Sequence, residues 1–143
     1  MTGKVLLLLI VGFLIFTPFK NHNTVEDDAK MIEGDWIPVA FELSGKKLPE
    51  AVFKDTKLIL NDGHYTYQND QGTYKLVSSE KFKAMDITGI DGPNKGKTFP
   101  AIYELTGDSL RICYDLEGKT RPSGFSTMAG TKQFLASYKR AKS

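Results

Sequence analysis

Short runs of alternating apolar and polar residues dominate the chain from Trp36 to its end. Glycine-containing turns interrupt these runs roughly every 8–12 residues, a spacing that is typical of all-β sandwiches and barrels. The pattern therefore predicts antiparallel strands that are joined in sequence by hairpins. The decisive check is whether the predicted turns place the apolar side chains on one face of the sheet.

The clearest hairpin is centred on Asp62-Gly63, a pair that favours a two-residue type I′ turn. With this turn, Leu60 faces Tyr65 and Leu58 faces Tyr67, all on one side of the hairpin. A slip of one residue would move the whole apolar set to the other face, so the agreement supports the register.

A second turn is predicted over Asn69–Gly72 as a four-residue loop. In that register Tyr67 faces Tyr74 and Tyr65 faces Leu76. The two turns therefore place the same tyrosines on the same apolar face, which we expect to point into the protein.

A third hairpin turns at Gly107-Asp108, where Leu105 faces Leu110 and Tyr103 faces Ile112. On its outer side Glu104 opposes Arg111, and Cys113 points away from the main apolar face. We interpret Cys113 as a small apolar filler rather than a reactive thiol.

Three further segments complete eight predicted strands. In Trp36–Leu43, the later apolar residues lie on the face opposite Trp36, and Pro38 is unsuited to a central strand, so a bulge near Pro38 is expected. Phe82–Thr88 and Lys132–Arg140 are the other strands, and Pro49–Lys54 is predicted as a short helix. The expected fold is an all-β, eight-stranded antiparallel up-and-down barrel with one short helix.

The N-terminus has a different composition from the rest of the chain. Val5–Phe16 is a run of uncharged apolar residues after Lys4, the layout of a signal peptide, and it is shorter than the roughly 20 residues of a membrane-spanning helix. Because no small-residue cleavage site follows, an uncleaved anchor and a buried helix remain alternatives. We expect a signal peptide or anchor at 1–19, a polar linker at 20–31 and the barrel domain at 32–143, in an exported or membrane-anchored protein.

Composition narrows the possible chemistry. The 143 residues carry a formal net charge of +2, which gives no electrostatic footprint for nucleic acid. A single cysteine excludes an internal disulfide, and two histidines leave few side chains for a metal site. No metal and no cofactor are therefore expected. The only expected link to a membrane is the N-terminal segment, if it is not cleaved.

A catalytic site is also not predicted. The segment from Gly92 to Thr98 imitates a phosphate-binding loop, but it is one residue short and precedes a strand, so a simple turn is expected. His22 lies in the linker and His64 on the outer face of its hairpin, and neither has partners for a triad or a zinc site. We therefore expect that the protein is not an enzyme.

Several motifs occur in a fixed order along the chain. Trp36 starts the first strand after Glu33-Gly34-Asp35, and Lys139-Arg140 ends the last strand. Between them lie Gly45-Lys46 with Pro49, Gly92–Thr98, Ile102-Tyr103-Glu104-Leu105, Gly107-Asp108 with Leu110, Ile112-Cys113-Tyr114, and Arg121-Pro122 with Phe125.

Over residues 32–141 this order resembles an uncharacterised family of small exported lipocalin-like (calycin-type) domains that is abundant in planctomycetes. The resemblance implies a barrel in which Trp36 packs under Arg140 as a closing structural pair. It implies no activity, and Gly124 stands where that family usually has an acidic residue.

The inward tyrosines are the candidate binding residues. Tyr65, Tyr67, Tyr74 and Tyr103 would line a ligand cavity, with Phe125 at its mouth in the Arg121–Gly130 loop, a possible lid or interaction loop. Small barrels can also be packed solid by side chains. The hypotheses are therefore a carrier of a small apolar ligand or lipid in the cell envelope, or an envelope interaction module with a solid core and an unknown protein partner.

Overall fold

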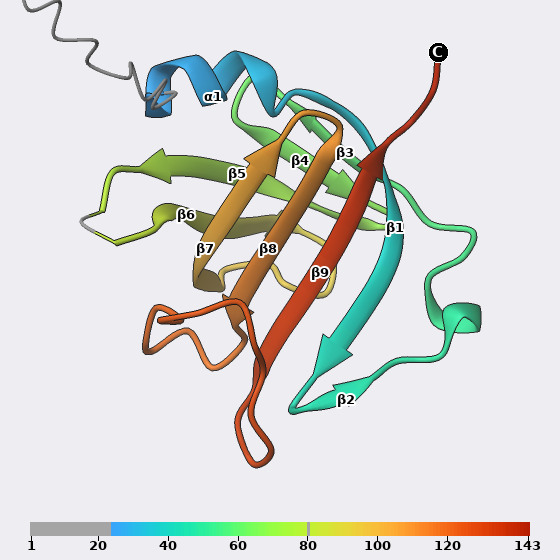
Figure 1. Ribbon diagram of the computed structural model, residues 1–143, viewed down its shortest axis with the longest axis vertical. Coiled ribbons are helices and arrows are strands. Elements are labelled where there is room, and N and C mark those ends of the chain that lie inside the picture. Colours follow the sequence, from blue (N-terminus) through green and yellow to red (C-terminus); the bar gives the residue numbers. More distant parts are fainter. Residues whose placement is uncertain (1–23, 80) are drawn as a thin grey trace, which may run out of the picture.

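The computed structural model describes residues 24–79 and 81–143 (Figure 1). The predicted signal peptide or anchor and His22 lie outside the described residues. The elements are α1 (Val25–Met31), β1 (Gly34–Leu43), β2 (Lys46–Lys47), a single 3₁₀ turn η1 (Glu50–Val52), β3 (Leu58–Asn61), β4 (His64–Tyr67), β5 (Asp70–Val77), β6 (Lys83–Asp91), β7 (Thr98–Thr106), β8 (Ser109–Asp115) and β9 (Gln133–Arg140).

The strands form one antiparallel sheet in the order β2-β1-β3-β4-β5-β6-β7-β8-β9, so from β3 onward each strand pairs with the next strand in sequence. Pairing of β1 with β9, from Trp36 opposite Arg140 to Leu43 opposite Phe134, closes this sheet into a barrel. The two-residue strand β2 pairs with β1 beyond the wall, so eight strands form the barrel itself. The predicted eight-stranded antiparallel up-and-down barrel is confirmed, and closure removes the free sheet edges.

The first strand contains the bulge that its sequence predicts. Its pairing with β9 shifts between Pro38 and Ala40. Trp36 and Pro38 are buried before this shift and Phe41 after it, while Val39 is exposed. One extra residue reverses the alternation, so both halves of the strand send apolar side chains inward.

Two of the three predicted hairpin registers are confirmed. Leu60 lies opposite Tyr65 in the first hairpin, whose turn residue Gly63 has φ 73°. In the β7–β8 hairpin, Tyr103 lies opposite Ile112, and the predicted outer pair forms an ion pair between Arg111 and its partner Glu104. Two-residue turns with a glycine fix the register locally, which explains the agreement.

The predicted register between β4 and β5 is wrong by four residues. Tyr67 lies opposite Asp70, not Tyr74, because the chain reverses within two residues at Gln68 and Asn69. Gln68 adopts φ 53°, in the left-handed region that glutamine rarely occupies, so the sequence does not indicate a turn at this residue. A shift by an even number leaves the tyrosines on the inner face, but it also brings Asp70 into the barrel.

The predicted polar linker contains helix α1 in place of irregular chain. Thr24 caps it by accepting a hydrogen bond from the N–H of Asp27, whose carboxylate accepts from the Thr24 N–H in return. The helix lies across one end of the barrel (Figure 1). The helix predicted around Pro49 is only the 3₁₀ turn η1. Neither described helix has the length and apolar character needed to cross a membrane.

The predicted Trp36–Arg140 pair lies at the α1 end. The Arg140 guanidinium carbon is 4.3 Å from the centre of the fully buried Trp36 ring. Arg140 also donates to the carbonyl oxygen of Glu33 at 2.7 Å, and the Trp36 indole donates to the carbonyl oxygen of Ile32 at 2.8 Å. These bonds tie the start of β1 to the end of β9 and close this end of the barrel.

The long connection between β8 and β9 lies against the outside of the barrel wall. Arg121 donates to the carbonyl oxygens of Met85 and Ala101, at 3.2 and 2.8 Å, and forms an ion pair with Asp86 at 2.6 Å. The Thr127 hydroxyl accepts from the Gly45 N–H at 2.8 Å. The Arg121–Gly130 loop is therefore a strap over the outer face and not a lid over the barrel mouth.

Asp115 organises the start of this connection and makes stability depend on pH. Burial by itself raises the pKa of its carboxyl, but N–H donors of Thr120, Lys119 and Glu117 outweigh burial and hold that pKa below its ordinary value. We expect Asp115→Asn to lower the free energy of unfolding by roughly 1–2 kcal/mol near neutral pH.

The difference between wild type and Asp115→Asn should shrink on acidification. A lowered pKa in the folded protein stabilises it above the unfolded-state pKa, and the contribution is lost as pH falls through the folded value. Urea unfolding at several pH values measures this. A difference in unfolding free energy that stays constant from pH 7 down to strongly acidic pH would show that the ionised Asp115 carboxylate does not stabilise the fold.

Candidate functional site

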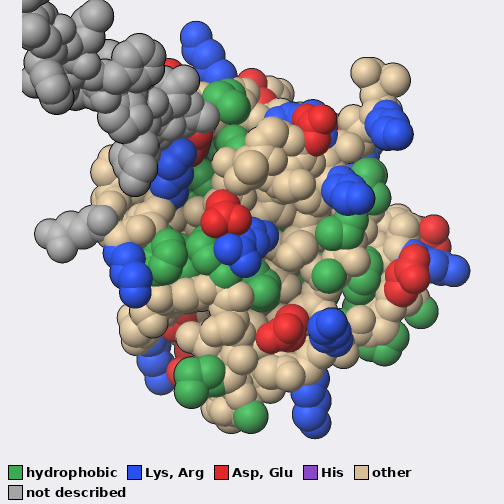
Figure 2. Space-filling model, viewed as in Figure 1, with side chains coloured by type: hydrophobic (Ala, Val, Ile, Leu, Met, Phe, Trp, Pro, Cys, Tyr) green, Lys and Arg blue, Asp and Glu red, His purple; other side chains and the backbone are tan. Residues whose placement is uncertain are grey.

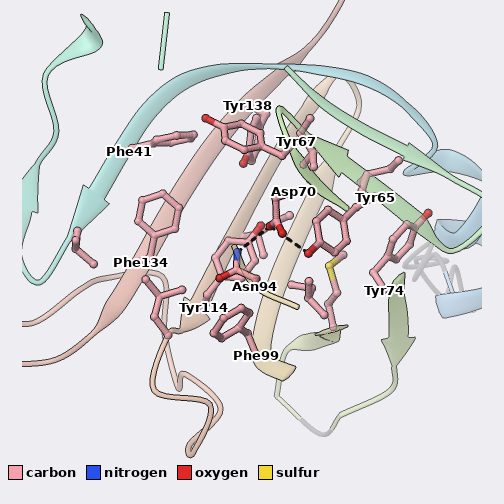
Figure 3. A pocket seen from close by; sticks show the side chains of 17 residues that line it. Phe41, Tyr65, Tyr67, Asp70, Tyr74, Asn94, Phe99, Tyr114, Phe134 and Tyr138 are labelled. Carbon is pink, nitrogen blue, oxygen red and sulfur yellow. Dashed lines mark hydrogen bonds between the residues drawn. The ribbon is translucent and has the colours of Figure 1, made fainter. Parts of the chain in front are cut away.

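A cavity of about 340 Å³ occupies the barrel interior toward the end opposite α1 (Figure 3). This volume falls within the roughly 300–1,000 Å³ of small-molecule sites. The barrel is therefore not packed solid along its whole length. The lining side chains are Phe41, Leu43, Leu58, Leu60, Tyr65, Tyr67, Asp70, Tyr74, Met85, Ile87, Asn94, Phe99, Ile112, Tyr114, Leu116, Phe134 and Tyr138.

One wall of the cavity is aromatic. The rings of Phe41 and Phe134 meet edge to face with centroids 5.0 Å apart, and Tyr138 lies 5.9 Å from Phe41. Tyr114 packs against Phe134 at 5.9 Å. Alternation along β1, β8 and β9 directs these rings to the inside, where they offer a rigid apolar surface to a ligand.

The opposite wall carries a polar cluster built on Asp70. The carboxylate Oδ2 of Asp70 accepts from the Asn94 amide at 2.7 Å and from the Tyr65 hydroxyl at 3.2 Å, as the dashed lines in Figure 3 show. Burial, with a further contribution from Asp70, raises the pKa of Tyr65 to about 12, so its hydroxyl remains a donor at neutral pH. The other oxygen, Oδ1, is buried without a hydrogen-bond partner among the described residues.

Glycines at two positions allow this cluster to form. A Cβ on Gly89 would lie 2.0 Å from the carbonyl oxygen of Asn94, so only glycine lets the β6–β7 loop cross the strand there. A Cβ on Gly72 would lie 2.6 Å from the Tyr65 ring. The loop that imitates a phosphate site is thus a turn before β7, as predicted, and it delivers the Asn94 side chain to Asp70.

The structure brings together three of the five predicted binding residues. Tyr65, Tyr67 and Tyr74 line the cavity, and the Tyr67 hydroxyl donates to Thr56 at 2.9 Å beside η1. Burial raises the pKa of Tyr74 above its ordinary value.

Two predicted binding residues lie elsewhere. Tyr103 is buried at the closed end, too far along β7 to reach the cavity lining, and donates to Asp28 of α1 at 2.8 Å. Phe125, expected at the mouth, packs on the outer face, with its ring 4.1 Å from the Arg111 guanidinium carbon and 5.5 Å from the Phe82 ring. Its loop follows the outer wall because Arg121 anchors it there.

Sequence reasoning missed Asp70 and Asn94, the polar groups of the cavity. Both lie in turn segments that are rich in glycine, asparagine and aspartate, where polar residues normally face solvent. The correct β4–β5 register would have placed Asp70 on the tyrosine face, but the residue types at Gln68 and Asn69 give no strong turn preference that would fix it.

The remaining candidates for chemistry lie apart from the cavity. Cys113 is fully buried and lies on the outer side of its hairpin, the orientation that the sequence predicts. Burial raises the pKa of its thiol to about 11. The His64 Nδ1 lies 2.9 Å from the carbonyl oxygen of Asp62 in an exposed turn. Within residues 24–79 and 81–143, no three His, Cys, Asp or Glu side chains gather to form a metal site.

Charged side chains of both signs are spread over the face formed by β7, β8 and β9. Figure 2 shows Lys and Arg interspersed with Asp and Glu and with small hydrophobic groups on this face. This mixture agrees with the formal net charge of +2 and gives the face no single sign. This face therefore offers no surface of a single charge, and the cavity is the candidate functional site.

No family model, no curated protein and no solved structure matches the chain. The fold and the cavity geometry therefore carry the functional argument by themselves.

Proposed function

We propose that this protein binds a small, mainly apolar molecule or a lipid inside its barrel, and that it acts by binding rather than by catalysis. The observation that carries the proposal is the cavity of about 340 Å³ with its aromatic wall. A barrel fold is compatible with ligand binding, because a closed wall of strands holds a cavity without exposing sheet edges.

The proposed setting is the cell envelope, with the N-terminal segment as a signal peptide or anchor. The apolar run Val5–Phe16 supports export, and the order of motifs from Trp36 to Arg140 supports kinship with the exported lipocalin-like family. An interaction module with a solid core is the weaker alternative, because the interior between the aromatic wall and Asp70 holds an open volume.

A pair of tryptophan variants on one strand tests whether ligands occupy the cavity. Ile87 lines the cavity, whereas Ile90, three residues further along β6, is 54% exposed. In Ile87→Trp the new indole fills part of the cavity, so the uncharged fluorescent probe N-phenylnaphthylamine should bind at least roughly tenfold more weakly than to wild type. In Ile90→Trp its affinity should stay within about twofold.

The readout is saturable probe fluorescence, with thermal unfolding of each variant to show that it is folded. Trp36 is a poor reporter because it lies at the closed end, outside the cavity lining. Absence of saturable binding to wild type at micromolar protein, or equal losses in both variants, would refute the cavity as a ligand site. If the probe does bind saturably, native mass spectrometry of the protein purified from its own source should detect a small molecule that copurifies with it.

A further inference from the structure

Asp70 is the one charged side chain among the described residues that line the cavity. The remaining lining residues are apolar apart from the tyrosine hydroxyls and the Asn94 amide. No Lys, Arg or His nitrogen within the described chain forms an ion pair with it. A carboxylate inside an otherwise uncharged cavity therefore sets the sign of the electrostatic potential that a ligand meets.

The hydrogen bonds of Asp70 leave the negative charge of its carboxylate only partly compensated. Tyr65 and Asn94 both donate to Oδ2, and they hold the carboxylate in one orientation. Oδ1 is buried and has no donor among the described residues. A carboxylate with an unpaired buried oxygen is costly, and a cation beside the carboxylate compensates this cost better than a neutral group does.

The surroundings of Asp70 suit a cation with an apolar body. Figure 3 shows Asp70 between Tyr65 and Asn94, with the rings of Phe134 and Tyr138 elsewhere around the cavity. Aromatic faces attract cations, and the aromatic wall also accepts a hydrocarbon chain. A carboxylate headgroup would instead meet Asp70 with a charge of the same sign.

We propose that the preferred ligands of this cavity are amphiphilic amines, whose ammonium group pairs with the carboxylate of Asp70 while the hydrocarbon part lies against the aromatic wall. This inference rests on the proposed binding function and specifies its ligand class. Alcohols of the same shape bring only a neutral hydroxyl to the same carboxylate and bind more weakly. Fatty acids bind most weakly of the three.

Three ligands with the same hydrocarbon chain test the inference: octylamine, octanol and octanoate, titrated into the full chain by calorimetry below micelle-forming concentrations. At neutral pH, octylamine should bind roughly tenfold or more tightly than octanol, because its bond to Asp70 is charge-assisted. Octanoate should bind more weakly than octanol.

Replacement of the carboxylate should remove this ranking. In Asp70→Asn the affinity for octylamine should fall at least roughly tenfold, that for octanol should change less than threefold, and octanoate should gain. Asp55→Asn is the matched control, because Asp55 is exposed and outside the cavity lining, and it should keep the wild-type ranking. Ile87→Trp should weaken all three ligands.

The outcomes separate this inference from the broader proposal. If none of the three ligands and no neutral probe binds to wild type, the binding function itself fails. If octanol or the neutral probe binds but octylamine is no tighter than octanol, the amine preference fails and the binding function stands. The ranking on wild type decides this point even if Asp70→Asn does not fold, and an unchanged ranking in folded Asp70→Asn would also overturn it.

Discussion

Trp36→Ala should lower the free energy of unfolding by roughly 3–5 kcal/mol, the cost of truncating a large buried aromatic side chain. The ring is fully buried at the closed end, its indole donates to Ile32, and the Arg140 guanidinium stacks on it at 4.3 Å. Its loss leaves a void where β1 and β9 meet. Urea or thermal unfolding followed by circular dichroism measures the change.

A double-mutant cycle isolates the contribution of the Trp36–Arg140 contact. Arg140→Met keeps an apolar stem, and its coupling with Trp36→Ala should be about 1–2 kcal/mol if the stacked pair is partly desolvated. Arg140 also bonds the Glu33 carbonyl, so the single variant alone overstates the stacking. A loss below 1 kcal/mol in Trp36→Ala would show that this residue does not close the barrel.

Asp28→Ala is expected to destabilise the fold by about 2–4 kcal/mol, because it removes the acceptor of two donors at the closed end. Asp28 of α1 is fully buried, and its Oδ2 accepts from Lys83 at 2.6 Å and from Tyr103 at 2.8 Å. Without it the Tyr103 hydroxyl is left buried without its acceptor, whereas the partly exposed Lys83 can turn to water.

The companion variants assign this loss to the Tyr103 hydroxyl. In a Tyr103→Phe background no hydroxyl remains, so Asp28→Ala should cost clearly less there than in wild type. Glu26→Ala, an exposed position in the same helix, should change stability by less than about 0.5 kcal/mol. Equal costs of Asp28→Ala in both backgrounds would mean that Tyr103 does not depend on α1.

Asp28 also attaches α1 to the barrel. The sequence predicts a linker at 20–31, and within that range Asp28 makes buried contacts with β6 and β7 at the closed end. The Asp28 carboxylate alone makes these contacts. Because the residues around Asp28 are also polar, the sequence does not distinguish it from a solvent-exposed position.

Local sequence determined the parts of the fold that depend on neighbouring residues. The turns at Asp62-Gly63 and Gly107-Asp108 carry their own conformational preference, so the registers of β3–β4 and β7–β8 follow from them. Period-two alternation then placed Tyr65, Tyr67 and Tyr74 inside. The bulge near Pro38 follows from the same alternation, whereas the Trp36–Arg140 pair was predicted from the family resemblance.

Only the tertiary structure decided the features that depend on distant contacts. Alternation cannot distinguish registers that differ by an even number of residues, so the predicted pairing of Tyr67 with Tyr74 fitted the pattern as well as the actual pairing of Tyr67 with Asp70. Arg121 anchors its loop outside through the carbonyls of β6 and β7, and this moves Phe125 away from the mouth. The polar pair of the cavity, Asp70 and Asn94, is 24 residues apart in sequence and meets because the β6–β7 loop crosses over Gly89 and returns to the start of β5.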